Sequence, residues 1–192
     1  MNLTLNLTNY IQNTCGALKK TPFDQLNKAA EVLLRARREG RWIFAAGNGG
    51  SSATASHFAN DFVKGLSVEG RKRFKCMALC DGIPILTCLA NDFDYSLCFT
   101  EQLKNYGSAG DVLVVYSGSG NSPNVVNAAR LAREMGMTVI SFTGRDGGKL
   151  HALSDVGCIA PSDCMEEIED IHMVWEHALV VCMREIIRSE KE

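Results

Sequence analysis

Long apolar runs are missing from this chain of 192 residues, and none reaches the roughly 18 apolar residues that a bilayer-spanning helix needs. The first residues also lack the charged region and the continuous apolar block of a secretory signal peptide. Neither sign of charge is in excess, because the net charge is -2, and the run Arg71-Lys72-Arg73 is too short to mark a nucleic-acid-binding surface. We therefore expect a cytoplasmic protein that binds neither a membrane nor a nucleic acid.

Short motifs that define other kinds of protein are absent as well. The eight cysteines include no C-x-x-C pair, and most stand among apolar residues, which is typical of reduced core thiols. Two glycine-rich turns do not fit G-x-G-x-x-G, because Ser52 and Pro123 stand where the third glycine belongs. No P-loop pattern with Gly-Lys-Ser/Thr occurs either. The sequence thus argues against a dinucleotide-binding fold and against a P-loop protein.

What the chain does have is a pair of similar turns, each between a strand pattern and a helix pattern. The apolar run 112–116 leads into Ser117-Gly118-Ser119-Gly120-Asn121-Ser122, and the run 42–46 leads into Gly47-Asn48-Gly49-Gly50-Ser51-Ser52. Such turns offer backbone N–H groups, serine hydroxyls and the positive end of a helix dipole, which together suit a phosphate. The two turns therefore predict a phosphorylated ligand held between the carboxyl ends of parallel strands.

Strand and helix patterns alternate along most of the chain. Apolar strand patterns cover 41–46, 74–80, 111–116, 137–142 and 155–160, and helical patterns separate them. Two helices are predicted within about 1–40, the second with Thr21 as its N-cap and Pro22 in its first turn, and a long helix covers about 164–188. This order predicts one α/β domain over 1–192, with a doubly wound, mainly parallel five-stranded sheet.

Titratable side chains gather on two of the predicted helices. His57 and Asp61 stand four residues apart, which places both on one helix face. The last helix carries Glu169, His172 and His177. If the two helices meet, His57, Asp61, Glu169 and His177 form a two-histidine, two-carboxylate site for a divalent metal such as Zn²⁺. One difficulty is that residues 169 and 177 are separated by roughly 12 Å of helix rise.

The core side of the last helix is also predicted from its apolar residues. The predicted stripe consists of Ile168, Ile171, Val174, Trp175, Ala178 and Val181. Because charged residues and histidines are interleaved with this stripe, some of them must flank or enter buried surface.

Together, the two turns and the last helix resemble the sugar isomerase (SIS) domain family over nearly the whole chain. The resemblance is carried by Gly47-Asn48-Gly49-Gly50-Ser51, His57-Phe58-Ala59, Ala90-Asn91-Asp92-Phe93, Gly110-Asp111-Val112-Leu113, Ser119-Gly120-Asn121-Ser122, Thr143-Gly144-Arg145-Asp146-Gly147-Gly148 and Ile171-His172. It implies an aldose–ketose isomerase that acts through an enediolate, with sedoheptulose 7-phosphate as substrate and D-glycero-D-manno-heptose 7-phosphate as product. It also implies a homotetramer with active sites at subunit interfaces.

The resemblance assigns roles to individual residues. It implies that a phosphorylated sugar is bound by Asn48, Gly49, Ser51, Asp92, Ser117, Gly118, Ser119, Ser122 and Glu169. It makes Asp61 and His177 the catalytic pair, and it implies a zinc ion bound by His57, Asp61, Glu169 and His177.

Some positions depart from the family pattern. Asp61 and Glu169 stand where the family has glutamate and glutamine, and Gly118 replaces a threonine. Two other functions therefore stay open, both known among SIS proteins: a non-enzymatic partner of a DnaA-type replication initiator, and a sugar-phosphate sensor without turnover. The joint presence of His57, Asp61 and His177 favours an enzyme.

Overall fold

The computed structural model describes residues 3–190, so both ends of the predicted domain, 1–2 and 191–192, lie outside the described residues. The strands are β1 (Trp42–Ala46), β2 (Lys75–Ala78), β3 (Val112–Ser117), β4 (Thr138–Gly144) and β5 (Val156–Ala160). The α-helices are α1 (Leu3–Leu18), α2 (Phe23–Glu39), α3 (Gly50–Asn60), α4 (Ile83–Asp92), α5 (Cys98–Tyr106), α6 (Pro123–Glu134), α7 (Gly148–Ala152) and α8 (Met165–Ser189). Two short turns complete the order, the π-helical η1 (Asp61–Gly65) and the 3₁₀-helical η2 (Tyr95–Leu97).

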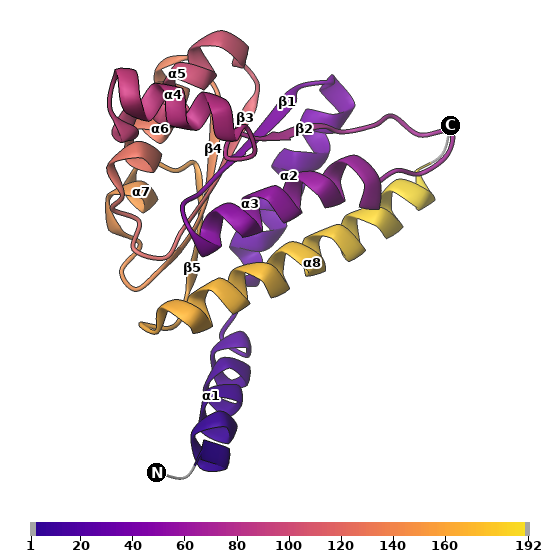
Figure 1. Cartoon of the computed structure of the whole chain (residues 1–192). Helices are drawn as coiled ribbons and strands as arrows, with labels where there is room; N and C mark the ends of the chain where they lie inside the picture. Colours follow the sequence, from indigo (N-terminus) through magenta and orange to yellow (C-terminus); the bar gives the residue numbers. More distant parts are fainter. Residues whose placement is uncertain (1–2, 191–192) are drawn as a thin grey trace.

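The five strands form one parallel sheet in the order β2-β1-β3-β4-β5, which confirms the predicted fold class. Strand β3 illustrates that helices cover both faces of the sheet. Val114 and Tyr116 pack with α2, α3 and α8, whereas Leu113 and Val115 pack with α4, α5, α6 and α7. Continuous apolar strands of this kind are typical of parallel sheets that are buried on both sides (Figure 1).

The long helix α8 runs alongside α3 on one side of the sheet, whereas α1 extends away from the body of the molecule (Figure 1). Tyr10 of α1 still reaches α8, because its hydroxyl donates a hydrogen bond of 2.7 Å to Asp170. Within residues 3–190, no helix is both long enough and apolar enough to cross a membrane.

Two details of the predicted helices are wrong. Pro22, not Thr21, occupies the N-cap position of α2. The Thr21 hydroxyl instead donates to the carbonyl of Leu18 and accepts a hydrogen bond from the indole of Trp175, so it ties the connection between α1 and α2 to α8. The predicted core stripe of α8 is also rotated, since Val174 and Val181 are 45% and 55% exposed.

Candidate functional site

The two glycine-rich turns meet at the carboxyl edge of the sheet. Strands β1 and β3 are neighbours, with Ala46 paired to Val115, so the segments that follow them lie side by side. A pocket of about 280 Å³ opens between these turns and the start of α8. Its lining consists of Asn48, Gly49, Gly50, Ser51, Tyr116, Ser117, Gly118, Ser119, Ser122, Met165 and Glu169. The structure therefore brings together all the predicted substrate-binding residues except Asp92.

The second turn is held in shape by its own serines and by close packing. The Ser117 hydroxyl accepts a hydrogen bond from the amide of Gly120, and the Ser119 hydroxyl accepts one from the amide of Asn121, each at 3.2 Å. Gly120 has a φ of +63°, and a side chain there would collide with the carbonyl oxygen of Gly147. This turn thus needs glycine at position 120.

The first turn is fixed by a pair of side-chain amides that the sequence analysis did not single out as a pair. Asn48 and Asn124 exchange two hydrogen bonds, of 2.9 and 2.8 Å, and the Tyr95 hydroxyl donates a third to the Asn48 oxygen at 2.8 Å. Asn124 is buried in the first turn of α6. Because Asn48 follows β1 and Asn124 follows β3, these bonds hold the two turns at a fixed separation.

Glu169 and Asp92 occupy different places relative to this pocket. The Glu169 carboxylate lies against Gly50, at the N-terminus of α3, and burial together with Glu166 and Asp170 raises its pKa. Asp92 ends α4, where it is exposed and accepts a hydrogen bond of 2.8 Å from Asn91. Asp92 is outside the pocket lining found among the described residues.

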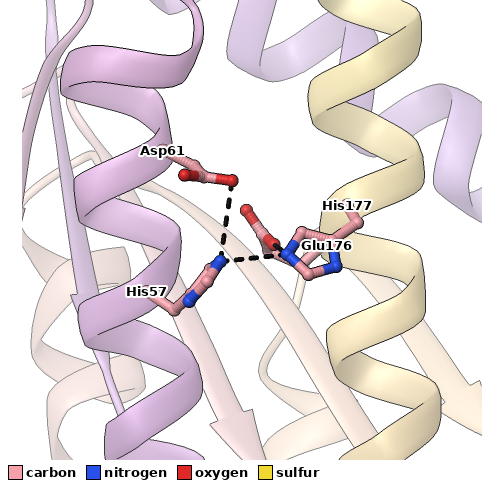
Figure 2. A group of neighbouring side chains, drawn as sticks. All are labelled: His57, Asp61, Glu176 and His177. Atoms are coloured by element: carbon pink, nitrogen blue, oxygen red, sulfur yellow. Dashed lines mark hydrogen bonds and ion pairs between the residues drawn. The ribbon is translucent and has the colours of Figure 1, made fainter.

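A second group of side chains lies further along α3, where it faces α8. Figure 2 shows His57, Asp61, Glu176 and His177 pointing toward one another from the two helices. The Nε2 atoms of the two histidines are 2.9 Å apart, and His57 Nε2 lies 3.6 Å from Asp61 Oδ2. One ligand atom from each of the four residues falls within 4.8 Å of the others. The two predicted helices therefore do meet, and they bring three of the four predicted metal ligands together.

A local change of helix type accompanies Asp61. Helix α3 ends at Asn60, and Asp61 begins the π-helical turn η1, in which the amide of Leu66 bonds to the Asp61 carbonyl at 2.9 Å. Single π-helical turns inside longer helices are frequent at functional sites.

Glu176 is the member of this cluster that is not among the site residues predicted from the sequence. Its side chain is fully buried, and among residues 3–190 neither carboxylate oxygen has a hydrogen-bond partner. Burial, and then the nearby charge of Asp61, raise the pKa of Glu176 to about 8. A helical signal for its burial did exist, since Glu176 stands eight residues after Ile168 and four after His172, and both are buried.

Glu169, by contrast, lies outside the cluster. It precedes Glu176 by seven residues, or roughly 10 Å of helix rise. Its carboxylate lies instead against Gly50, beside the first glycine-rich turn. In the described chain, Glu176 thus occupies the place in the cluster that the sequence analysis gave to Glu169.

Comparisons with known proteins agree with this architecture. The model of the SIS domain family matches residues 7–144. A phosphoheptose isomerase of Aliarcobacter butzleri is 36% identical over 88% of this chain and 88% of its own length, and one of Aromatoleum aromaticum is 40% identical over 79% and 77%. The solved phosphoheptose isomerase GmhA of Neisseria gonorrhoeae superposes with a TM-score of 0.87 at 33% identity, over 96% of this chain and 100% of that one. The chain belongs to the SIS domain family.

Proposed function

We propose that this protein is a phosphoheptose isomerase, which interconverts sedoheptulose 7-phosphate and D-glycero-D-manno-heptose 7-phosphate. The observation that carries the proposal is the pairing of two sites on one helix. The serine- and glycine-lined pocket lies at the start of α3, and the histidine–carboxylate cluster lies two turns further along the same helix. The similarity to proteins named phosphoheptose isomerase over most of the chain supports it.

The spacing of the two sites suits a phosphorylated sugar chain. From Gly50 to His57, α3 rises by about 10 Å. An extended seven-carbon chain with a terminal phosphate spans roughly 10 Å by standard bond lengths. The phosphate would bind the turn around Ser119, where hydroxyls, amides and the N-termini of α3 and α6 converge. The carbonyl end would then reach the cluster.

In this proposal the other pocket residues orient the sugar. Asn48, Gly49 and Ser51 would contact it from the first turn, and Ser117, Gly118 and Ser122 from the second. Glu169, which flanks the pocket at the first turn, would accept hydrogen bonds from sugar hydroxyls. The predicted contact of Asp92 with the sugar stays a prediction.

Isomerisation requires a base that removes a proton beside the carbonyl and an acid that returns it to the neighbouring carbon. Asp61 and His177 are the proposed pair, in either order. His57, Asp61 and His177 would hold a zinc ion, which fits because three potential ligand groups converge beside the buried carboxylate of Glu176, which accepts no hydrogen bond within residues 3–190. When bound, Zn²⁺ supplies polarisation of the enediolate oxygens.

The test is an NMR time course with sedoheptulose 7-phosphate in D₂O. We expect product to form, with solvent deuterium at the carbon that receives the proton, because an enediolate exchanges that proton with the base. Asp61→Asn and His177→Ala should each lose turnover by at least about 100-fold. Glu185→Gln is the control, since Glu185 lies on the same helix, is 67% exposed and pairs with Arg188. Substantial turnover in both catalytic variants would contradict the assigned roles.

The two other candidate functions give different results in the same assay. A sugar-phosphate sensor would be stabilised by the substrate without forming product. A partner of a replication initiator would show no turnover on any sugar phosphate and would capture the initiator. The isomerase relatives, together with the convergence of both histidines, favour the enzyme.

We also propose that the protein acts in the cytoplasm as a homotetramer, as its family resemblance implies. Large apolar side chains stand exposed along α1 and α8, among them Leu3, Leu7, Ile11, Val174 and Val181. Neighbouring protomers would cover these side chains. Light scattering should give a mass of four protomers, near 84 kDa from 21.0 kDa each, and a monomeric mass would contradict the assembly.

A further inference from the structure

The carboxylate of Glu176 is buried without a hydrogen bond to any of residues 3–190. Its side chain has no exposed surface. A buried polar group is strongly destabilising unless something satisfies it, and a carboxylate has only three means: a hydrogen-bond donor, a cation or a proton. Its surroundings on the helix side are apolar, since Trp175, Leu179 and Val180 beside it are buried in the core.

The orientation of the Glu176 carboxylate favours a cation over a proton or a hydrogen-bond donor. Its Oε2 lies 3.5 Å from Nε2 of His177, the same nitrogen that faces His57 (Figure 2). A carboxylate that merely orients a metal-bound histidine contacts the other ring nitrogen, away from the metal. Asp61 likewise approaches the inward-facing Nε2 of His57. All four side chains therefore direct their donor atoms at one volume.

The spacing of the donor atoms fits a small divalent ion. Ligands at 2.0–2.1 Å from a tetrahedral Zn²⁺ lie about 3.3 Å from one another. The distances between neighbouring donors here are 2.9, 3.5 and 3.6 Å. Small side-chain adjustments would therefore complete a tetrahedron, and two carboxylates would neutralise the charge of the ion.

We propose that Glu176 is the fourth protein ligand of a divalent cation that His57, Asp61 and His177 also bind. This inference rests on the metal site of the proposed function and replaces the predicted ligand Glu169, which lies at the pocket. Glu169 is thereby free to contact the sugar.

The experiment compares Zn²⁺ binding by the metal-free full-length chain and three variants, using isothermal titration calorimetry. Glu176→Gln keeps the shape of the side chain, and Glu176→Leu replaces a buried carboxylate, which accepts no hydrogen bond within residues 3–190, by an apolar group. Glu169→Gln is the matched control on the same helix. Visible absorption after Co²⁺ loading provides a second readout, because its band intensity reports the number of ligands around the ion.

We expect the wild type to bind one Zn²⁺ per protomer. Glu176→Leu should lower the affinity by at least about 100-fold and change the Co²⁺ bands, since loss of an outer-shell partner alone costs 10–100-fold. Glu176→Gln should also bind more weakly, and Glu169→Gln should bind like the wild type. Thermal unfolding in EDTA monitors folding, and in a separate scan without EDTA added Zn²⁺ should raise the Tm of the wild type by more than that of Glu176→Leu.

Several outcomes would overturn the assignment. The assignment would be wrong if Glu176→Leu and Glu176→Gln both bound Zn²⁺ with the affinity of the wild type. It would also be wrong if Glu169→Gln were the only variant that bound Zn²⁺ more weakly. A wild type that binds no Zn²⁺ would refute this ligand set, yet isomerase activity in the NMR assay would leave the proposed function standing. Conversely, Zn²⁺ binding through Glu176 without isomerisation would support the ligand set and refute the function.

Discussion

His172 lies between α8 and the sheet, and its titration makes the free energy of unfolding depend on pH in a way that can be tested. Its ring is 1% exposed and lies near the rings of Tyr116, Phe142 and Trp175. Its Nε2 lies 3.0 Å from the carbonyl oxygen of Thr143 at the end of β4. A carbonyl can only accept, so Nε2 must carry a hydrogen and donate it. Burial lowers the pKa of His172 from 6.5 to about 4.

The sign of the pH effect follows from this shift. Between pH 6.5 and 4 the unfolded chain binds a proton at His172 that the folded chain does not, so the free energy of unfolding falls as the pH falls through this window. A full shift of 2.5 pKa units corresponds to about 3 kcal/mol. Between pH 7.5 and pH 5.0 the linkage relation gives a loss of about 2 kcal/mol from this group.

The assay is urea unfolding at pH 7.5 and pH 5.0, in EDTA, for the wild type and His172→Gln. Glutamine does not titrate, and its amide can still donate to the Thr143 carbonyl. Glu176 also titrates in this range and acts in the opposite direction, because its pKa is raised, but its contribution is common to both proteins. We expect the wild type to lose about 2 kcal/mol more than the variant on acidification. Equal losses in the two proteins would refute the reasoning.

Two further predictions concern the second turn and the assembly. Gly120→Ala should reduce the free energy of unfolding by at least about 2 kcal/mol, because it combines a positive φ with a collision against the backbone of Gly147. Gly118→Ala should cost no more than about 1 kcal/mol, because its new methyl group meets the flexible thioether of Met165; urea unfolding ranks the two, and the reverse order would contradict this account of the turn. Val181→Glu should lower the mass measured by light scattering below that of the tetramer, because it puts a charge on the exposed apolar face of α8, and an unchanged mass would place the interface elsewhere.

Much of the candidate site could be predicted because its parts are local. A turn between a strand and a helix is encoded by neighbouring residues, so the segments that begin at Gly47 and Ser117 were recognisable in the sequence. The spacing of His57 and Asp61 likewise placed both on one helix face. Glu176 was missed because the predicted core stripe of α8 included Val174, and the true stripe is rotated toward Glu176.

The sequence by itself determined the alternation of strands and helices, and with it the parallel sheet buried on both faces, because hydrophobic periodicity acts within each segment. Only the tertiary structure decided which side chains share a site. The order β2-β1-β3-β4-β5 makes β1 and β3 neighbours, and this brings together turns that are 70 residues apart in the chain. The rotation of α8 about its own axis then buries Glu176 beside His57 and leaves Glu169 at the pocket, since packing against α2, α3 and the sheet sets that rotation.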